Sequence, residues 1–472
     1  MAQRCTENVK SMGIEHHVLK IPWSEDGFPE KPSTAFEGDA RIARFRILFD
    51  AMTKANATVL ALGHHEDDQV ETSIMRILKG STADGAAGMK HCRRWGMDRQ
   101  LQEYEGMKRW VVRPLLTFPK DRLLATCEAE KLDYVVDATN FQPGITIRNA
   151  IRHWLSNDGK QTEDDKHLFD VPVFQNRLDA LGIDVNLSAG VDKIYHAVSA
   201  FAFQSDDIDH EVDQTLSRNT LRSPPGTYLI PHNTLACIEN PKVQRALVLR
   251  ILRYISNHPW GSLAAQSKRR SHSLLLLVEK LWGSNHFTPS FTVGAGVVWR
   301  PVAMKGYGFR IIRRGFYGLQ DGEQFGWIAT RINPPSSEKQ GPPLWVDITR
   351  LIASKFIAGE SSCQILYDNR FFITFNLTLL PSRIEEVIRS SRGEIMLAPD
   401  SDWFHPHVVL RRPDRNDVIF HSVVQSPKDL VLFPNTDARE VDKWPKISPM
   451  GFIAPVPSPW VTAEFIRPLT SM

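Results

Sequence analysis

The densest group of chemically active side chains lies in residues 64–72, which read His-His-Glu-Asp-Asp-Gln-Val-Glu-Thr. They follow an apolar run at 58–63 that ends in glycine, and a helical pattern comes after them. This order predicts a strand, a loop and a helix, and ligands of open α/β sheets bind at such turns, beyond the carboxyl ends of the strands. Two histidines and several carboxylates so close together do not fit a hydrophobic core. The segment therefore predicts a site inherited from an enzyme.

Charged residues also follow two later apolar runs. A predicted strand at 110–112 ends at Arg113, and another at 133–136 ends at Asp137. Arg148 and Arg152 are four residues apart, which places them on one face of a helix. If the strands are neighbours in one sheet, these side chains meet the 64–72 segment at the same edge.

The helix after residue 67 is expected to begin near Asp68. Asp68 and Glu71 have the spacing of a capping box, in which two side chains satisfy the first backbone N–H groups of a helix. The two carboxylates therefore have a structural role open to them as well as a ligand-binding one. The helix N-terminus favours anions, so the clustered carboxylates require a compensating cation.

The elements that must position these residues alternate along the first 155 residues. Predicted strands at 16–21, 58–63, 110–112 and 133–136 are separated by helical patterns, including one from residue 37 and one at 120–131. Such alternation predicts an α/β domain with a parallel sheet and crossover helices. We expect three regions: an α/β domain at 1–155, a mainly helical region at 156–288 and a mixed, strand-rich α+β region at 289–472.

Charge is unevenly distributed, although the formal net charge of the chain is only +3. Residues 241–315 hold thirteen Lys or Arg and one acid, interleaved with aromatic residues, whereas residues 156–213 contain acidic clusters. Such asymmetry favours a polyanionic partner such as RNA; the alternative is a solvated helix face beside ordinary strands. The candidate RNA-binding residues are Lys268, Arg269, Arg270, Arg313 and Arg314.

Several other classes of protein are disfavoured by the composition. The five cysteines lie far apart, without the spacing of metal ligands, and are expected to be reduced structural thiols. No apolar run is long enough to span a bilayer, and the first residues do not resemble a secretory signal.

Five ordered blocks within about 115 residues resemble the tRNA(Ile)-lysidine synthetases, a branch of the N-type ATP pyrophosphatases in the PP-loop superfamily. The resemblance covers about a third of the chain, and the last 180 residues match no family that we can assign. The blocks are Glu37-x-x-Ala40-Arg41-x-x-Arg44-Phe45, residues 64–72, Arg113-Pro114-Leu115-Leu116, Asp137-x-Thr139-Asn140 and Arg148-Asn149-x-x-Arg152.

The resemblance implies an adenine nucleotide alpha hydrolase-like fold and a ligase that modifies tRNA. ATP adenylates the C2 oxygen of the wobble cytidine of tRNA(Ile), and the ε-amine of L-lysine then displaces AMP to leave lysidine. The expected ligands are ATP, Mg²⁺, lysine and tRNA(Ile). The resemblance implies catalytic roles for Asp67, Asp68, Glu71, Asp137, Arg148 and Arg152, with Asp68 and Glu71 as the pair that holds lysine. It further implies nucleotide contacts by His64, His65, Arg41, Arg44 and Arg113, and a Mg²⁺ contact by Asp67.

One part of the family pattern is missing. The Ser-Gly-Gly-x-Asp-Ser loop that cradles pyrophosphate has no counterpart, because the chain contains no Gly-Gly pair. We therefore expect an N-terminal truncation that removes two strands and the loop, either through an incomplete gene model or through loss of catalysis. In the second case the chain is a non-catalytic RNA-binding protein derived from this fold. As it stands the chain is expected to be a poor enzyme, in the cytoplasm or, since the family is also organellar, in mitochondria.

Two rival enzyme classes have weaker support. A metal-dependent hydrolase would use His64, His65, Asp67 and Asp68 as ligands, but adjacent histidines do not both reach one ion easily. A tRNA thiolase of the same superfamily usually carries paired cysteines, which this sequence lacks.

Overall fold

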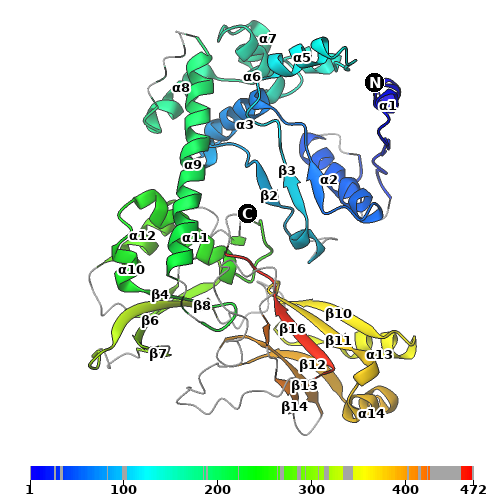
Figure 1. Ribbon diagram of the computed structural model, residues 1–472, viewed down its shortest axis with the longest axis vertical. Coiled ribbons are helices and arrows are strands. Elements are labelled where there is room, and N and C mark those ends of the chain that lie inside the picture. The colour runs from blue at the N-terminus through cyan, green and yellow to red at the C-terminus, as the bar shows by residue number, and fades with distance from the viewer. Residues whose placement is uncertain are drawn as a thin grey trace. The chain divides into compact units, whose positions relative to one another are not determined.

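The chain folds into two compact units (Figure 1). The first holds residues 1–95 and 108–207, and the second holds 96–107 and 208–471. The computed structural model describes residues 2–25, 28–31, 36–81, 83–97, 104–183, 185, 187, 190–219, 221, 223–262, 264–265, 271–283, 289–292, 294–306, 308–312, 318–332, 344–400, 403–412, 416–421, 424–425 and 459–469.

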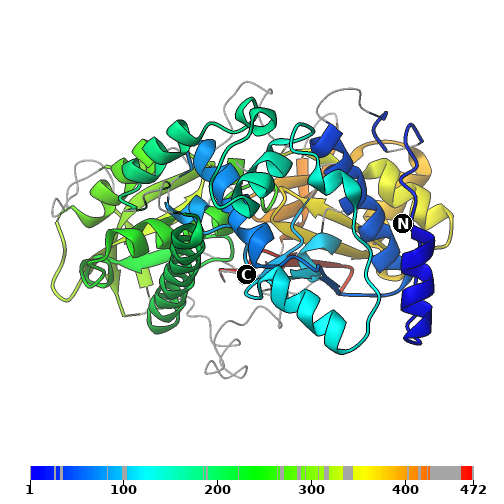
Figure 2. The same ribbon diagram turned by 90° about the horizontal axis from the view of Figure 1, so that it is seen from above.

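The first unit alternates short strands with helices, as the sequence predicts. Helix α1 lies at the outside of this unit and buries none of its side chains (Figures 1 and 2). The elements are α1 (Ala2–Ser11), α2 (Phe36–Lys54), β1 (Val59–Ala61), α3 (Glu66–Leu78), α4 (Ala83–Ala86), β2 (Cys92–Arg94), β3 (Trp110–Val112), α5 (Lys120–Ala129), α6 (Ile147–Ser156), α7 (Glu163–Lys166), α8 (Val171–Ala180) and the start of α9 (Asp192–Arg218).

The sheet of the first unit is partly parallel. Strand β3 lies in the middle, parallel to β1 and antiparallel to β2. The parallel pair brings the ends of β1 and β3 to one edge, where residue 62 still donates a hydrogen bond to the carbonyl of Val112. The antiparallel strand β2 was not predicted, because its three residues, Cys-Arg-Arg, carry no apolar run.

Two predicted strands are wrong. Residues 133–136 and 16–21 are irregular, although Val18, Tyr134 and Val136 have the apolar character expected of strand residues. These three side chains are 41–54% exposed. A strand requires a partner whose backbone groups lie in register, and neither segment pairs with a strand among the described residues. The apolar pattern alone therefore led to the wrong assignment.

The described residues of the second unit form three sheets, which are built almost entirely from antiparallel pairs. The sheets have the orders β4-β8-β6-β5 with β7 beside β6, β14-β13-β12-β9, and β10-β11-β16-β15. The strands are β4 (Tyr228–Pro231), β5 (Phe291–Thr292), β6 (Val297–Lys305), β7 (Gly308–Ile311), β8 (Gln324–Arg331), β9 (Val346–Asp347), β10 (Ser362–Tyr367), β11 (Phe371–Asn376), β12 (Glu394–Pro399), β13 (Pro406–Arg411), β14 (Asn416–His421), β15 (Val424–Gln425) and β16 (Val461–Phe465). The helices are α10 (His232–Ala236), α11 (Pro241–Ile255), α12 (Ser271–Trp282), α13 (Thr349–Ile357) and α14 (Ser382–Ser390).

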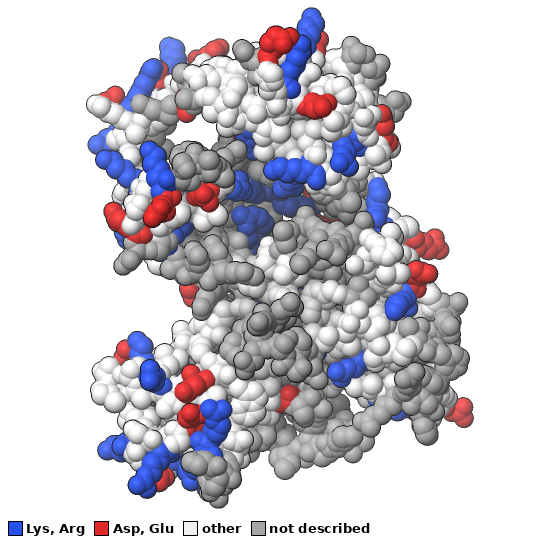
Figure 3. All heavy atoms as spheres, turned by 180° about the vertical axis from the view of Figure 1, so that it is seen from behind, with Lys and Arg blue, Asp and Glu red and all other residues white. Residues whose placement is uncertain are grey.

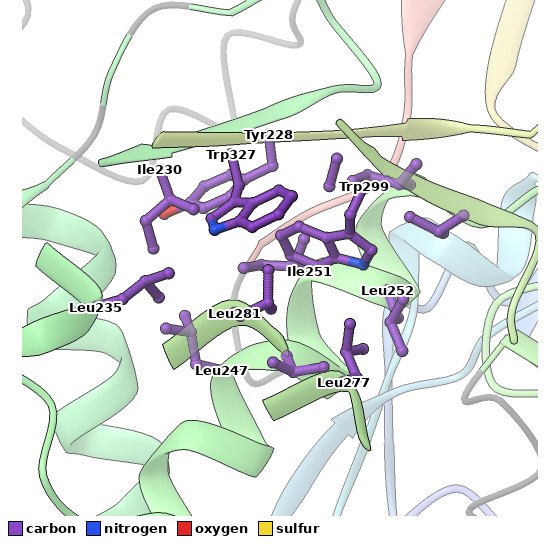
Figure 4. Packing of buried hydrophobic residues seen from close by; sticks show 14 of the residues in the cluster. Tyr228, Ile230, Leu235, Leu247, Ile251, Leu252, Leu277, Leu281, Trp299 and Trp327 are labelled. Carbon is purple, nitrogen blue, oxygen red and sulfur yellow. The ribbon is translucent and has the colours of Figure 1, made fainter. Parts of the chain in front are cut away.

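The largest core of the second unit lies between the first of these sheets and helices α10, α11 and α12. Figure 4 shows Trp299 and Trp327 reaching from the strands toward leucines of the helices, among them Leu247 and Leu277. Both tryptophans are almost completely buried. Burial of such large side chains stabilises a fold by several kcal/mol each. Truncation of a buried tryptophan to alanine lowers the free energy of unfolding by about 3–5 kcal/mol.

The long helix α9 belongs to both units, because the division falls between residues 207 and 208. The division of the sequence into regions at 155 and 288 stays a prediction. Within the described part of the chain, no helix combines the length and apolar character needed to cross a membrane.

Candidate active site at the strand ends of the first unit

The 64–72 segment lies where the sequence places it, between strand β1 and helix α3. The helix begins at Glu66 with His65 as its N-cap, two residues earlier than predicted. Asp68 is the third residue of the helix, and its carboxylate accepts a hydrogen bond of 3.2 Å from the backbone N–H of His65. Asp68 thus does take part in capping, but as the acceptor within the first turn rather than as the N-cap itself.

Glu71 is buried and ion-paired to both arginines predicted to share its site. Its side chain is only 1% exposed. Arg152 donates from Nε and Nη2 to the two carboxylate oxygens over 2.7 and 3.0 Å, and Arg148 Nε lies 3.5 Å from Oε2. Burial raises the pKa of Glu71, while the hydrogen bond and charge of Arg152 oppose this rise. Helix α6 thus brings a bidentate cation to a carboxylate that water does not reach.

Asp67 is held by two donors from distant parts of the sequence and by a contact with its near neighbour His65. Tyr195 of α9 donates to Oδ1 over 3.0 Å, the backbone N–H of Lys120 donates to Oδ2 over 2.9 Å, and His65 Nδ1 lies 3.3 Å from Oδ2. Burial raises the pKa of Asp67, but the hydrogen bonds from His65, Lys120 and Tyr195 outweigh it and lower the pKa to about 2. Asp67 therefore ties the first turn of α3 to α5 and α9.

Replacing Tyr195 with Phe is expected to lower the free energy of unfolding by about 1.5–3 kcal/mol at pH 7, because a hydrogen bond to an ionised partner is lost. The folded pKa of Asp67 lies below its unfolded value of about 3.9. Its stabilising contribution is therefore complete above that value and disappears as the pH falls through about 2. Urea unfolding at pH 7 and pH 2.5 should show the difference between wild type and variant shrinking at the lower pH. The exposed Tyr134, changed to Phe, is the matched control; equal losses in the two variants would contradict the assignment.

The neighbouring histidines have opposite electrostatic environments. Burial lowers the pKa of His64, and the charges of Arg113, Arg148 and Arg41 add to this against the opposing effect of Asp68. For His65 burial also acts to lower the pKa, but the hydrogen bond to Asp67 and the charges of Asp68, Asp67 and Glu71 raise it overall. At neutral pH His64 is thus biased toward the neutral imidazole and His65 toward the cation. Such pairs with separated pKa values are typical of sites that divide acid and base roles.

The segment 85–89 after α3 is fastened to the helix. Gln69 donates to the carbonyls of Ala87 and Met89 over 3.1 and 2.9 Å, and its Oε1 accepts from the N–H of Met89 over 2.6 Å. Arg76 Nη1 donates to the carbonyls of Gly85 and Gly88. Polar side chains of α3 thus hold this segment in place.

Replacing Gly88 with Ala is expected to destabilise the first unit by more than about 1 kcal/mol. Gly88 has φ +75°, and a Cβ there would lie 2.6 Å from Oε1 of Gln69. The substitution both strains the backbone and displaces the Gln69 clamp. Urea unfolding and the rate of proteolysis within 79–90 measure the effect. Gly144, whose Cβ would meet no atom within 4 Å, is the control; a Gly88 variant as stable as the Gly144 variant would disprove the strain.

The remaining predicted residues of the first unit are spread over its elements. Arg113 follows β3 and is 4% exposed, and Arg41 and Arg44 lie on exposed positions of α2. Arg41 acts electrostatically on His64 and Arg113. Asp137 lies after the irregular segment 132–136, outside the sheet, so the predicted strand does not position it. The catalytic and nucleotide-binding roles of all these residues stay predictions.

The predicted RNA-binding residues Lys268, Arg269, Arg270, Arg313 and Arg314 lie outside the described residues. Part of the basic stretch 241–315 is neutralised within the protein. Arg250 is buried and pairs with Asp209 and Asp213, which belong to the acidic stretch of the sequence. Arg310 pairs with Glu323 over 2.7 Å. The contrast in charge along the chain therefore partly reflects an internal helix contact between α9 and α11.

Sequence reasoning missed two residues that shape the site, Tyr195 and Gln69. Tyr195 lies 128 positions from its partner Asp67, and no local pattern connects residues so far apart. Gln69 lies within the predicted motif, but only its contacts with 87–89 reveal its role as a clamp.

Comparison with known proteins agrees with the resemblance seen in the sequence. Residues 1–158 match the PP-loop domain family. The chain is 37% identical over 128 residues to the tRNA(Ile)-lysidine synthase of Bacillus subtilis strain 168, a match that covers 27% of this chain and 25% of the relative. It is 36% identical over 137 residues to that of Bradyrhizobium sp. strain BTAi1 (29% and 34%) and 33% identical over 170 residues to that of Rhodopseudomonas palustris strain CGA009 (36% and 44%).

The chain thus spans a quarter to less than half of the length of these curated relatives. The matched family implies an adenine nucleotide alpha hydrolase-like α/β fold and ATP use, which fits the partly parallel sheet with its functional groups at the strand ends. The site described above lies entirely within this region or, for Tyr195, packs against it. The first 158 residues of the chain thus match the PP-loop domain family, and the relatives that share this region are named tRNA(Ile)-lysidine synthases.

Proposed function

We propose that the protein is a tRNA-modifying ligase that joins L-lysine to the wobble cytidine of a tRNA(Ile). ATP adenylates the C2 oxygen of the cytidine, pyrophosphate leaves, and the ε-amine of lysine then attacks C2 and displaces AMP. The observation that carries this proposal is the ion-paired cluster of Asp68, Glu71, Arg148 and Arg152, which lies at the end of β1 within the region shared with named lysidine synthases.

The cluster divides the expected roles among its members. Glu71 is fully engaged by Arg152, so its part is to fix the two arginines of α6. Asp68 is more accessible, with a side chain 16% exposed and Oδ1 4.0 Å from Arg152 Nη2. We assign Asp68 to the ammonium group of lysine and Arg148 and Arg152 to the phosphate charge that develops as adenylate forms and leaves. Cations placed where charge develops stabilise the transition state.

Asp67 fits a positioning role better than that of a magnesium ligand. Both of its oxygens already accept hydrogen bonds from the protein, and no group of three or more potential ligands gathers within the described ranges. Mg²⁺ commonly binds through nucleotide phosphates with only one or two carboxylates, so it remains part of the proposal as a partner of ATP.

The test is ATP-dependent incorporation of labelled lysine into tRNA(Ile) transcripts, together with release of AMP. The purified protein is compared with Asp68→Asn and with Glu128→Gln, a substitution at an exposed position of α5. We expect lysine incorporation at a low rate, because the loop that cradles pyrophosphate has no counterpart in the sequence. Asp68→Asn should reduce that rate at least a hundredfold, which is about 2.7 kcal/mol of transition-state stabilisation. The Glu128 variant should retain full activity.

Failure to incorporate lysine with any tRNA(Ile) would reject the ligase proposal. Binding of tRNA without ATP consumption would instead favour the alternative, a non-catalytic RNA-binding protein. Contacts to about six phosphates would lower the affinity roughly 10³-fold between 50 and 200 mM salt.

A further inference from the structure

The connection between strands β2 and β3 leaves the first unit and packs within the second. Residues 96–107 belong to the second unit, although the strands on either side of them belong to the first. The described residues of this connection, 96–97 and 104–107, form its tip. Backbone pairing runs from the N–H of Arg113, which donates to the carbonyl of His91 over 2.8 Å, to the N–H of Gly96, which donates to the carbonyl of Gly106 over 3.2 Å. Residues 91–113 therefore form one hairpin.

The base of the hairpin is fixed to helix α2 of the first unit. The ring of Trp95 lies 5.3 Å from the rings of Phe45 and Phe49, measured between centroids. The N–H of Trp95 donates to the carbonyl of Arg109 over 2.8 Å. Arg109 is buried, donates from Nη1 to the carbonyl of Phe49 over 2.9 Å and places Cζ 3.9 Å from the centroid of the Phe49 ring. These contacts lie where the chain passes into the second unit.

The tip of the hairpin packs on the sheet that contains β10, β11 and β16. Leu366, Phe372 and Glu464 are neighbours across these three strands. They face away from the core that contains Phe371, because side chains alternate along a strand. The ring of Tyr104 stacks on Phe372 with 4.0 Å between centroids and 22° between planes, and its hydroxyl donates to Glu464 over 3.4 Å. The tip thus covers part of the outer face of this sheet.

Two buried methionines complete this attachment. Met97 and Met107 pack with Trp260 and Ile466, and all four side chains are at most 8% exposed. The N–H of Met97 donates to the carbonyl of Trp260 over 3.0 Å. Gly96 has φ +98°, and a Cβ there would lie 3.2 Å from the same carbonyl, so the close approach favours glycine. The attachment is therefore apolar, and one backbone hydrogen bond fixes its register.

The contacts of the tip differ from those around helices α13 and α14 of the same unit. Exposed ion pairs join Lys355 to Glu360 and Arg389 to Glu385 there. Figure 3 shows acidic and basic side chains interspersed in this part of the unit, at the lower left. Salt screens exposed ion pairs, whereas the tip is held mainly by buried apolar side chains. We therefore expect the attachment of the tip to resist sodium chloride.

The strands of the hairpin need such support. Strand β2 lies at the edge of its sheet, and each of its three residues is only partly buried. A short strand pair is marginally stable in water unless it packs against other elements. Strand β3 in turn pairs with β1 along Val59–Ala61, and its end leads directly to Arg113 at the candidate site. Whatever steadies the hairpin therefore also steadies the strand ends that carry the site.

We propose that hairpin 91–113 is a conformational link, in which the anchoring of its tip within the second unit holds the β2–β3 pair and the strand ends of the candidate site. The link makes the local stability of these strands depend on side chains of β11. Because a coupling free energy acts in both directions, a change that frees the tip loosens the strands, and a change that fixes the strands steadies the tip. The inference goes beyond the proposed function and does not depend on it.

Hydrogen exchange of the full chain, followed by mass spectrometry, tests the link. Phe372→Ala removes the ring on which Tyr104 stacks. It should speed exchange of residues 92–95 and 109–113 by about tenfold or more, because local opening becomes easier when packing is lost. The matched control is Phe356→Ala, which removes another partly buried ring of the second unit, one that packs against the core. The control should change exchange of 92–95 and 109–113 less than about twofold.

A double variant distinguishes the link from a general loss of stability. Tyr104→Ala already removes the ring stack, so the addition of Phe372→Ala should change exchange of 92–95 and 109–113 by less than about twofold further. If Phe372→Ala does not fold, Tyr104→Ala leaves the sheet intact and should by itself produce the rise of about tenfold. Sodium chloride up to about 0.5 M should leave exchange of 92–95 in wild type unchanged.

Two results would overturn the inference. One is faster exchange confined to 104–107 in Tyr104→Ala, with 92–95 and 109–113 unchanged. The other is an equal effect of Phe372→Ala and Phe356→Ala on the hairpin. Loss of protection of 92–95 at high salt would overturn its apolar attachment. These measurements need no tRNA, ATP or lysine, so their failure and the failure of the ligase proposal are distinguishable.

Discussion

Replacing Asp368 with Asn should destabilise the second unit by at least about 3–5 kcal/mol, the usual result of removing one partner from a buried ion pair. Asp368 accepts hydrogen bonds from Arg331 Nη2 over 2.9 Å and from Arg370 Nε over 2.7 Å, and Arg331 Nε lies 2.8 Å from its Oδ2. All three side chains are at most 2% exposed. The substitution leaves two cations buried without a counter-charge. A third buried arginine, Arg467, lies near enough that the charge of Arg370, after burial, contributes to lowering its pKa to about 9.

The effect of Asp368→Asn is measured by urea unfolding and by hydrogen exchange of β8 and β11, the strands next to the two arginines. Asp321, at an exposed turn position, serves as the control and should change the unfolding free energy by less than about 0.5 kcal/mol when replaced with Asn. Replacing Arg331 and Arg370 with Met in the Asp368→Leu background should recover much of the loss, because an apolar set of similar volume often substitutes for a buried ion network. Unchanged exchange in β8 and β11 would show that the network contributes nothing.

Replacing Arg152 with Met should cost the first unit about 3–5 kcal/mol for the same physical reason. Glu71, at 1% exposure, would retain only the 3.5 Å contact with Arg148. Burial already raises the pKa of Glu71 and Arg152 opposes it, so the pKa in the variant should rise further. A carboxyl with a raised folded pKa favours the folded state when protonated. The variant should therefore regain stability as the pH falls from 7 toward 5, more than wild type does.

Urea unfolding across this pH range tests the prediction, with Arg122→Met at an exposed position of α5 as the control. The double variant Glu71→Met/Arg152→Met should be more stable than Arg152→Met alone, since it removes the unpaired carboxylate together with its partner. A double variant that adds the two single losses would mean that the residues do not act as a pair. It would also remove the basis for assigning Glu71 the role of fixing α6.

The site in the first unit shows what local sequence can predict. The apolar run before residue 64 and the helical spacing after it were sufficient to place His64 to Glu71 at a strand–helix junction. The spacing of Arg148 and Arg152 placed both on one face, and the structure brings both to Glu71. These features depend on contacts within a few residues or on the periodicity of a single element.

The wrong predictions concern interactions between distant segments. Residues 133–136 have the composition of a strand but no partner in register within the described chain, whereas β2 has little strand character and pairs with β3 along its whole length. Helix α3 begins two residues earlier than predicted because His65, rather than Asp68, is the N-cap. Backbone pairing and capping depend on the position of the neighbouring group, which composition does not contain.

The sequence by itself determined the similarity to PP-loop domains, the strand–loop–helix unit that carries 64–72, and the residue types available for chemistry, because these depend on order and spacing along the chain. Only the tertiary structure decided how each charge is used. In the folded protein Glu71 pairs with Arg152, Asp67 accepts a hydrogen bond from Tyr195, and Asp368 pairs with two arginines. Arg93 and Arg113 have no carboxylate partner among the described residues. The physical reason is that the energy of a charge depends on its burial and on what lies within a few ångströms, and folding sets both.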